Sequence, residues 1–166
     1  YATVHRAIYR SSMRATELYH DARETVRRFI NASEVDEIVF TRNTTESLDT
    51  IIAGFDWKTG EEAVMAQQDY GAMLDMFALQ TKRHGIVNTI VSLPIDPESD
   101  AEIVQLYANA ITPRTRLVMV SHMVNISGQI LPVAKICEMA HAKGVDVMVD
   151  GAHAFGQLTY TIPALG

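Results

Sequence analysis

The sequence contains one cysteine, Cys137, so it has no disulfide framework, and we expect a reducing, cytoplasmic setting. It lacks any apolar run close to the roughly 20 residues that a membrane-spanning helix needs. No basic run is present, and the formal net charge of -6 argues against nucleic acid or an anionic membrane as the main partner. With 166 residues, 48% of them hydrophobic, the chain is expected to form one compact domain.

Three motifs of common enzyme classes are also missing. The six histidines are scattered and no HExxH occurs, so we predict no metal site. The G-x-S-x-G of serine hydrolases is absent. No G-x-G-x-x-G precedes Asp150 by one βαβ unit, which counts against a nucleotide-binding oxidoreductase.

Both ends of the chain lack the marks of natural termini. The N-terminal segment YATVHRAIYR has no methionine and is not a signal peptide. No helix or strand is predicted to close the fold at the C-terminal TIPALG. We therefore expect that both ends have been cut.

Helical patterns recur along the chain. The first segment is predicted to be a long amphipathic helix, because apolar residues recur at gaps of three, four or seven: Val4, Ile8, Ala15, Leu18, Ala22, Val26 and Phe29. Further helices are predicted over Thr44–Gly54, Gly71–His84 and Ser99–Ala110. A fourth begins at Pro132, as its first helical residue, and ends just before Gly144.

Short β-prone segments alternate with these helices. They are Glu37–Thr41, Ala63–Ala66, Ile86–Leu93, Arg116–Ser121 and Val145–Val149. Alternation of strands and helices predicts an α/β domain with a mainly parallel sheet. Such sheets bind ligands outside the carboxyl ends of their strands, so the residues that follow each strand are the candidates for a binding site.

A helix start follows the first of these segments. Asn43 is a good N-cap, and Glu46, three residues later, resembles a capping box. The amides and hydroxyls of Thr44 and Thr45 would also suit a phosphate. Simple helix capping is the alternative.

Two further strand ends carry polar or aromatic side chains. Tyr70 offers a flat face for stacking on a planar ligand, or is a half-buried loop residue. Asn125 offers a donor and an acceptor, or is simply a turn residue.

The stretch VDVMVDGAHAFG ends a buried strand on a carboxylate. Burying the charge of Asp150 there costs free energy unless the carboxylate is paired. Asp150 therefore either caps the next helix or faces a cation in a ligand. His153 is a partner of Asp150, a second ligand contact, or the donor of a structural hydrogen bond.

Together these groups place phosphate donors, an aromatic face, an amide and a carboxylate along one sheet edge. This set suits a flat, phosphorylated, cationic ring, and pyridoxal 5'-phosphate is such a ligand. A carboxylate beside its ring nitrogen keeps that nitrogen protonated.

Three segments resemble the class V aminotransferase family of fold-type I pyridoxal-phosphate enzymes, which includes cysteine desulfurases, selenocysteine lyases and isopenicillin N epimerase-like proteins. They are INASEVDEIVFTRNTTESLDTIIAG, QQDYGAM and VSHMVNISGQILPVAKICEMAHAKGVDVMVDGAHAFG. The resemblance implies a three-layer αβα fold with a mainly parallel (mixed) sheet. Residues 1–166 would be a single, incomplete large domain.

The resemblance also implies roles for six residues. Thr44 and Thr45 would bind the cofactor phosphate, and Tyr70 would stack on its ring. Asn125 and His153 would lie at the ring's phenolic oxygen, and Asp150 would pair with the ring nitrogen. Tyr70, Asp150 and His153 would be the catalytic residues. Many desulfurases have histidine in place of this tyrosine and glutamine in place of this histidine.

The Schiff-base lysine of the family has no counterpart here. Sixteen residues follow Asp150, and none is lysine. The four lysines present, Lys58, Lys82, Lys135 and Lys143, do not follow the Asp150 strand. The small C-terminal domain, where desulfurases carry their nucleophilic cysteine, is also missing. Cys137 is expected to be a small buried residue of a helix.

The resemblance implies that the parent protein acts on an amino acid as an aminotransferase or epimerase-like enzyme, and that it is a homodimer. A cysteine desulfurase or selenocysteine lyase is the alternative. A further alternative is an inactive fragment or interaction module. The chain alone is expected to be inactive.

Overall fold

The computed structural model describes Val4 and residues 7–166, and it divides the chain into two compact units. The helical unit comprises Tyr1–Phe40 and Tyr160–Ala164, and the sheet unit comprises Thr41–Thr159 and Leu165–Gly166. The elements in chain order are α1 (Arg10–Ile30), η1 (Val35–Glu37), α2 (Thr44–Gly54), β1 (Glu62–Ala66), α3 (Gly71–His84), β2 (Val87–Val91), α4 (Asp100–Ala110), β3 (Thr115–Ser121), α5 (Val133–His141), β4 (Asp146–Asp150) and α6 (Ile162–Leu165).

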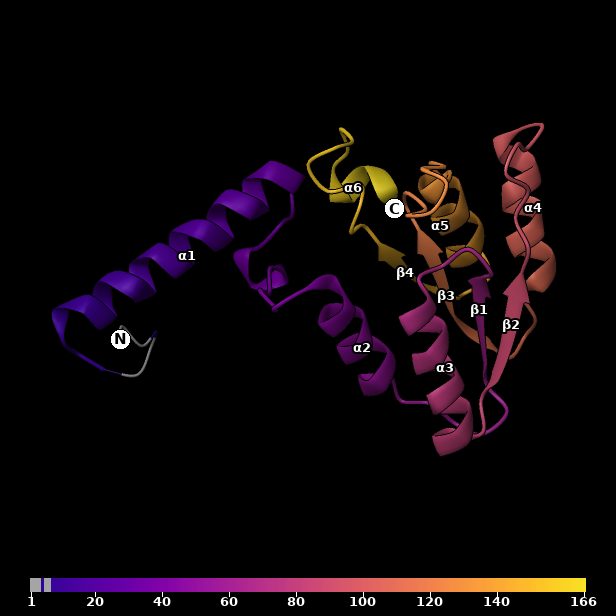
Figure 1. Ribbon diagram of the computed structural model, residues 1–166, viewed down its shortest axis with the longest axis horizontal. Coiled ribbons are helices and arrows are strands. Elements are labelled where there is room, and N and C mark those ends of the chain that lie inside the picture. The colour runs from indigo at the N-terminus through magenta and orange to yellow at the C-terminus, as the bar shows by residue number, and fades with distance from the viewer. Residues whose placement is uncertain (1–3, 5–6) are drawn as a thin grey trace. The chain divides into compact units, whose positions relative to one another are not determined.

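The sheet unit is built on four strands in the order β2-β1-β3-β4 (Figure 1). All three strand pairs are parallel, which confirms the predicted α/β class. The carboxyl ends of the strands therefore meet at one edge of the sheet. At that edge Ser121 of β3 lies in register with Asp150 of β4.

Each face of the sheet carries its own core, because successive side chains of a strand point to opposite faces. Ala63, Met65, Leu117 and Met119 pack with Leu48 and Ile52 of α2 and Met73 and Phe77 of α3. Val64, Ala66, Val118 and Val120 pack with Ile103 and Tyr107 of α4 and Ile136 and Ala140 of α5. The sheet unit is thus the predicted three-layer αβα arrangement.

The predicted elements of the sheet unit agree closely with the structure. Helices α2 and α3 have the predicted bounds, and the limits of the other predicted helices and strands shift by at most two residues. Gly85 ends α3 in the left-handed conformation, at φ 71°. Pro132 is the N-cap of α5 rather than its first helical residue.

The predicted strand Glu37–Thr41 is wrong. Glu37 ends η1, and the next residues form no strand. The Ile38 carbonyl accepts a hydrogen bond from Arg23 Nε at 2.8 Å, so α1 takes an acceptor that a neighbouring strand would need. Val39 is 74% exposed, so it lacks the burial that stabilises β-prone residues in a strand.

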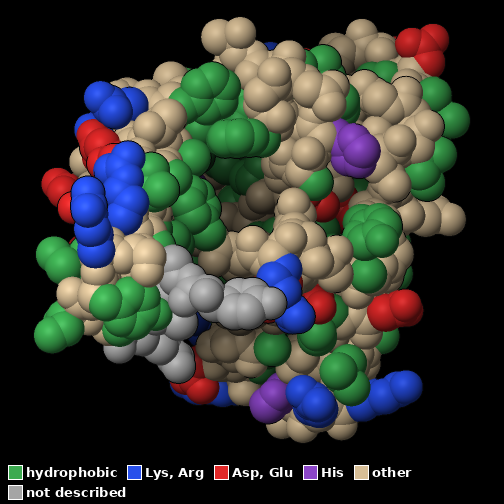
Figure 2. Space-filling model, turned by 60° about the vertical axis from the view of Figure 1, so that its left-hand side comes forward, with side chains coloured by type: hydrophobic (Ala, Val, Ile, Leu, Met, Phe, Trp, Pro, Cys, Tyr) green, Lys and Arg blue, Asp and Glu red, His purple; other side chains and the backbone are tan. Residues whose placement is uncertain are grey.

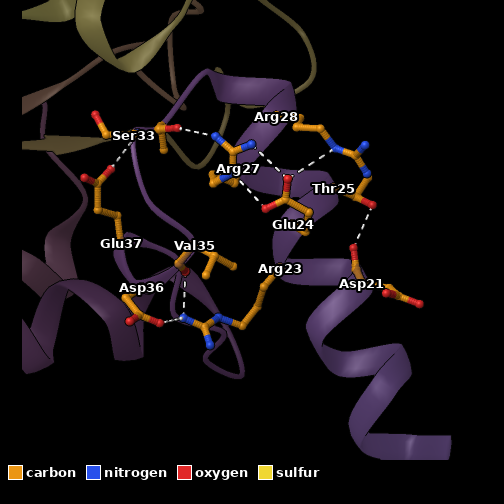
Figure 3. Close-up of polar contacts among 11 residues, drawn as sticks. Asp21, Arg23, Glu24, Thr25, Arg27, Arg28, Ser33, Val35, Asp36 and Glu37 are labelled. Carbon is orange, nitrogen blue, oxygen red and sulfur yellow. Dashed lines mark hydrogen bonds and ion pairs between the residues drawn. The ribbon is translucent and has the colours of Figure 1, made fainter.

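Polar contacts within the helical unit hold the turn after α1 (Figure 3). Arg23 donates to the Val35 carbonyl at 2.6 Å and to Asp36 Oδ1 at 3.1 Å. Arg27 donates to both carboxylate oxygens of Glu24, at 2.7 and 2.8 Å. Local sequence patterns do not reveal the contacts of Arg23, because these join residues more than ten positions apart.

The first helix is shorter than predicted. It begins at Arg10, so Val4 and Ile8 lie outside it, and Ile8 is 95% exposed. The rest of the predicted start, residues 1–3 and 5–6, lies outside the described residues.

Candidate functional site

A cavity of about 250 Å³ lies in the sheet unit at the carboxyl ends of the strands. Its lining residues come from α2 and from the segments at the ends of β1, β3 and β4: Thr44, Thr45, Leu48, Tyr70, Ser121, Met123, Asn125, Asp150, Ala152 and His153. All six residues proposed from the sequence are in this set. The volume is near the lower end, roughly 300 Å³, of the range for small-molecule sites.

The amino end of α2 forms one wall of the cavity. Asn43 caps the helix as predicted, since its side chain accepts from the Glu46 amide at 2.9 Å. The Glu46 carboxylate accepts from the Arg42 amide at 2.7 Å, one residue before the cap, and pairs with the Arg42 guanidinium. Thr44 and Thr45 thus begin a helix whose first amides have no carbonyl of the helix to bond. Those amides and the helix dipole favour an anion.

Tyr70 stands between β1 and α3, directly before Gly71. It is 47% exposed and lines the cavity, so its ring is available to a ligand rather than held in the core. The same exposure also fits the alternative of a half-buried loop residue, so the role of Tyr70 at the cavity stays a prediction.

Asn125 lies in a tight loop after β3. The Gly128 amide donates to the Val124 carbonyl at 2.8 Å, and Gly128 has φ 72°, a conformation that favours glycine. The turn interpretation of Asn125 is therefore correct as far as the backbone goes. Its side chain nevertheless lines the cavity.

Asp150 is the last residue of β4 and is only 9% exposed. Its Oδ1 accepts from the Ala152 amide at 3.0 Å, so the carboxylate caps the turn that follows the strand. In the described chain no hydrogen bond joins Asp150 to His153, which is exposed and lines the cavity. A buried carboxylate with one neutral donor favours a further cationic or hydrogen-bonding partner.

Two polar residues at this edge were missed by the sequence reasoning. Ser121 lines the cavity, and Asp69 accepts from its hydroxyl at 2.7 Å and its amide at 3.2 Å. Burial raises the pKa of Asp69 to about 6, although hydrogen bonds from Ser121 and Ala66 lower it, and the nearby Asp150 charge also raises it. The rule that selected Asp150, a carboxylate just beyond a buried strand, would also have selected Asp69.

Other candidate reactive groups lie elsewhere. Cys137 is buried in α5, and burial raises the pKa of its thiol, which disfavours a nucleophilic role. No lysine lines the cavity: Lys135 pairs with Asp100 at 2.7 Å, and Lys143 donates to the Ala108 carbonyl. Among the residues that the structure describes, no group of three His, Cys, Asp or Glu side chains could hold a metal ion.

The described helices include none that is long and apolar enough to cross a membrane. On the face drawn in Figure 2, acidic and basic side chains lie next to one another among exposed hydrophobic side chains.

The donor set fits pyridoxal phosphate. The cavity combines a helix start for a phosphate, an exposed aromatic ring, and a buried carboxylate that accepts one backbone amide bond. Each of these groups matches one part of a flat, phosphorylated, cationic ring.

Comparison of the sequence with known proteins shows its family. The family model described as "Aminotransferase class-V" matches residues 1–166. A probable cysteine desulfurase of Mycolicibacterium paratuberculosis is 32% identical over 99% of this chain, and a cysteine desulfurase of Dickeya dadantii is 33% identical over 99%. The chain spans 24% and 40% of the lengths of these two relatives.

A solved structure has the same fold. A C-DES mutant with glycine covalently linked to its PLP cofactor superposes with a TM-score of 0.86 at 25% identity, over 93% of this chain and 41% of that protein. The fold and the order of the segments are thus those of known pyridoxal-phosphate proteins.

Proposed function

The chain belongs to the class V aminotransferase family, and from that premise we propose that it forms the cofactor-binding part of a pyridoxal-phosphate enzyme acting on a sulfur-containing amino acid. The observation that carries the proposal is the single cavity lined by Thr44, Thr45, Tyr70, Asn125, Asp150 and His153. These residues come from four segments that are far apart in the sequence.

Thr44 and Thr45 would hold the cofactor phosphate by backbone amides and hydroxyls. The Asn43 cap supports this role, because it satisfies the Glu46 amide and leaves the first turn to an anion. The Glu46 carboxylate, next to that turn, pairs with the Arg42 guanidinium, so its negative charge is partly neutralised.

Asp150 would hold the proton on the ring nitrogen. The Ala152 amide fixes one carboxylate oxygen, and burial strengthens the interaction with a cation. Pyridoxal phosphate, when bound, supplies an electron sink that stabilises negative charge on the amino-acid substrate. Tyr70 would cover one face of the ring, while Asn125 and His153 would contact its phenolic oxygen.

The relatives favour carbon–sulfur chemistry over the aminotransferase or epimerase activity first expected. Both curated relatives described above are named as cysteine desulfurases, one of them as probable. We therefore propose cysteine desulfurase or a related lyase reaction. Tyr70 and His153 support an epimerase-like or aminotransferase activity as the second candidate, since many desulfurases have histidine and glutamine at these positions.

We further propose that the gene product is longer than this chain and forms a cytoplasmic homodimer. The chain spans less than half of its relatives, and it carries neither a lysine at the cavity nor an accessible cysteine. The Schiff-base lysine and the small domain would be supplied by the remaining length. Residues 1–166 would then be one incomplete large domain.

The test uses the intact gene product purified with pyridoxal phosphate. We expect a visible absorbance band that borohydride abolishes, and release of sulfide from L-cysteine. Keto-acid formation or racemisation without sulfide would select the second candidate. The absence of any cofactor band would refute the proposal and support an inactive module.

A further inference from the structure

The loop between β1 and α3 is fastened on both sides by two consecutive side chains. Gln68 donates from Nε2 to the Leu93 carbonyl at 2.6 Å and accepts from the Leu93 amide at 3.2 Å, which ties the loop toward β2. Asp69 accepts from Ser121 at the end of β3 and, through Oδ2, from the Ala66 amide at 2.8 Å. Residues 67–70 therefore bridge three adjacent strands.

Asp69 differs from Gln68 in what it connects. Its partner Ser121 lines the cavity, and its chain neighbour Tyr70 lines the same cavity. Ser121 is in register with Asp150, so the position of the β3 end also sets the position of β4 at this edge. Gln68 reaches Leu93, which is not among the lining residues.

The carboxylate is also an unexpected choice for a purely structural clamp. Asp69 is 5% exposed and makes no ion pair among the described residues. It lies close enough to the buried Tyr107 for its charge to contribute to the raised pKa of that phenol, whose main cause is burial. A buried charge with neutral partners stabilises a fold poorly.

We infer that Asp69 is a positioning residue of the cavity, which holds Ser121 and Tyr70 at a fixed separation by joining the ends of β1 and β3. Its three hydrogen bonds make this joint stiff, because both carboxylate oxygens are engaged. An asparagine has the same shape but only one acceptor oxygen, so its amide would face an N–H or O–H donor on one side. The consequence for cofactor binding rests on the function proposed above.

The first test measures amide hydrogen exchange in the intact gene product without cofactor. Asp69→Asn is expected to raise exchange about fivefold in both segments 66–70 and 121–125, as for the loss of one hydrogen bond. Gln68→Ala is the matched control, and it should raise exchange in 66–70 and around Leu93 but leave 121–125 unchanged. Faster exchange of Asp69→Asn in its own segment alone would overturn the inference.

The second test measures pyridoxal-phosphate affinity. Asp69→Asn should weaken binding about fivefold, whereas Asp75→Asn, the same change at an exposed site on α3, should stay within about twofold. Faster exchange in both segments without any loss of affinity would refute a role in positioning the cavity.

The two proposals fail in distinguishable ways. If the unmodified protein binds no pyridoxal phosphate, the proposed function is wrong, and the exchange experiment alone decides the role of Asp69. If Asp69→Asn does not fold, Ser121→Ala takes its place. It removes the hydroxyl bond from Ser121 to Asp69 and leaves only the amide bond. It should then raise exchange in 66–70, and unchanged exchange there would contradict the inference.

Discussion

A buried acid lies at each end of strand β1. The acid at the amino end has a charged partner, whereas the acid beyond the carboxyl end has only neutral ones. At the amino end Glu62 is 3% exposed and accepts from Arg114 Nε at 2.8 Å and from the hydroxyls of Thr112 and Thr115. These bonds, that of Thr112 first and those of Arg114 next, lower the pKa of Glu62. Beyond the carboxyl end, Asp69 has only neutral donors, and burial raises its pKa to about 6.

The difference separates a structural end of the sheet from a binding end. The protein itself supplies the cation for Glu62, so that carboxylate needs nothing more. At the other end the nearby Asp150 charge helps to raise the pKa of Asp69, and neither carboxylate makes an ion pair among the described residues. A positively charged ligand would lower the electrostatic cost there, which is consistent with the proposed ring nitrogen partner of Asp150.

The largest expected effect is an opposite pH dependence of stability at the two ends. Because the folded pKa of Asp69 is raised from 3.8 to about 6, the folded state binds the proton more tightly, and stability falls as pH rises through this window. The shift corresponds to roughly 3 kcal/mol of unfolding free energy. Denaturant unfolding of the protein without cofactor at pH 4 to 6.5 should show this decline reduced in Asp69→Asn.

If the unfolding free energy of Asp69→Asn falls with pH as steeply as that of the unmodified protein, the contrast between the two ends of the sheet is wrong. Glu62 supplies the internal contrast: its pKa is lowered, so its stabilisation is present above pH 4.5 and is lost as pH falls through the folded pKa. Glu62→Gln should therefore weaken the loss of stability at acid pH below 4.5.

The next largest effect is expected at the ring-nitrogen position. Asp150→Ala should weaken pyridoxal-phosphate binding by roughly 10- to 150-fold, the usual loss for a hydrogen bond to a charged group. It should also reduce turnover far more than Asp150→Glu does. Asp146→Ala is the control, since Asp146 is exposed at the opposite end of the same strand. Near-normal affinity and turnover in Asp150→Ala would remove Asp150 from the site.

A smaller effect is expected at the amino end of the sheet. Glu62→Gln should lower the unfolding free energy at pH 7 by roughly 1.5 kcal/mol, because charge-assisted bonds to Arg114 are weakened. Cofactor affinity should not change, since Glu62 is not among the residues that line the cavity. A loss of affinity in this variant would show that the two ends of the sheet are not independent.

The smallest effect is expected for the exposed aromatic ring. Tyr70→Ala should weaken cofactor binding roughly 2- to 12-fold, the range for one aromatic contact, without melting the protein. Tyr70→Phe retains the ring face and serves as the control. A large drop in the thermal midpoint of the alanine variant would mean that Tyr70 is part of the core.

The local patterns of the sheet unit were sufficient to predict its elements. Asn43 caps the start of α2, Gly85 ends α3 in the left-handed conformation, and continuous apolar runs mark β1 and β3. The segment EIVFT has an equally β-prone composition, but it forms no strand. A strand needs a partner as well as a propensity, and the Ile38 carbonyl bonds to Arg23 instead.

The sequence by itself determined the element types and the chemistry at the strand ends, including the six residues proposed for the site. Periodicity, caps and polar residues after apolar runs are local properties, and they can be read within a few positions. Only the tertiary structure decided that the six residues line one cavity and that Asp69 reaches Ser121, 52 positions away. Strand order and register bring these groups together, and both depend on pairing between distant segments that no local pattern encodes.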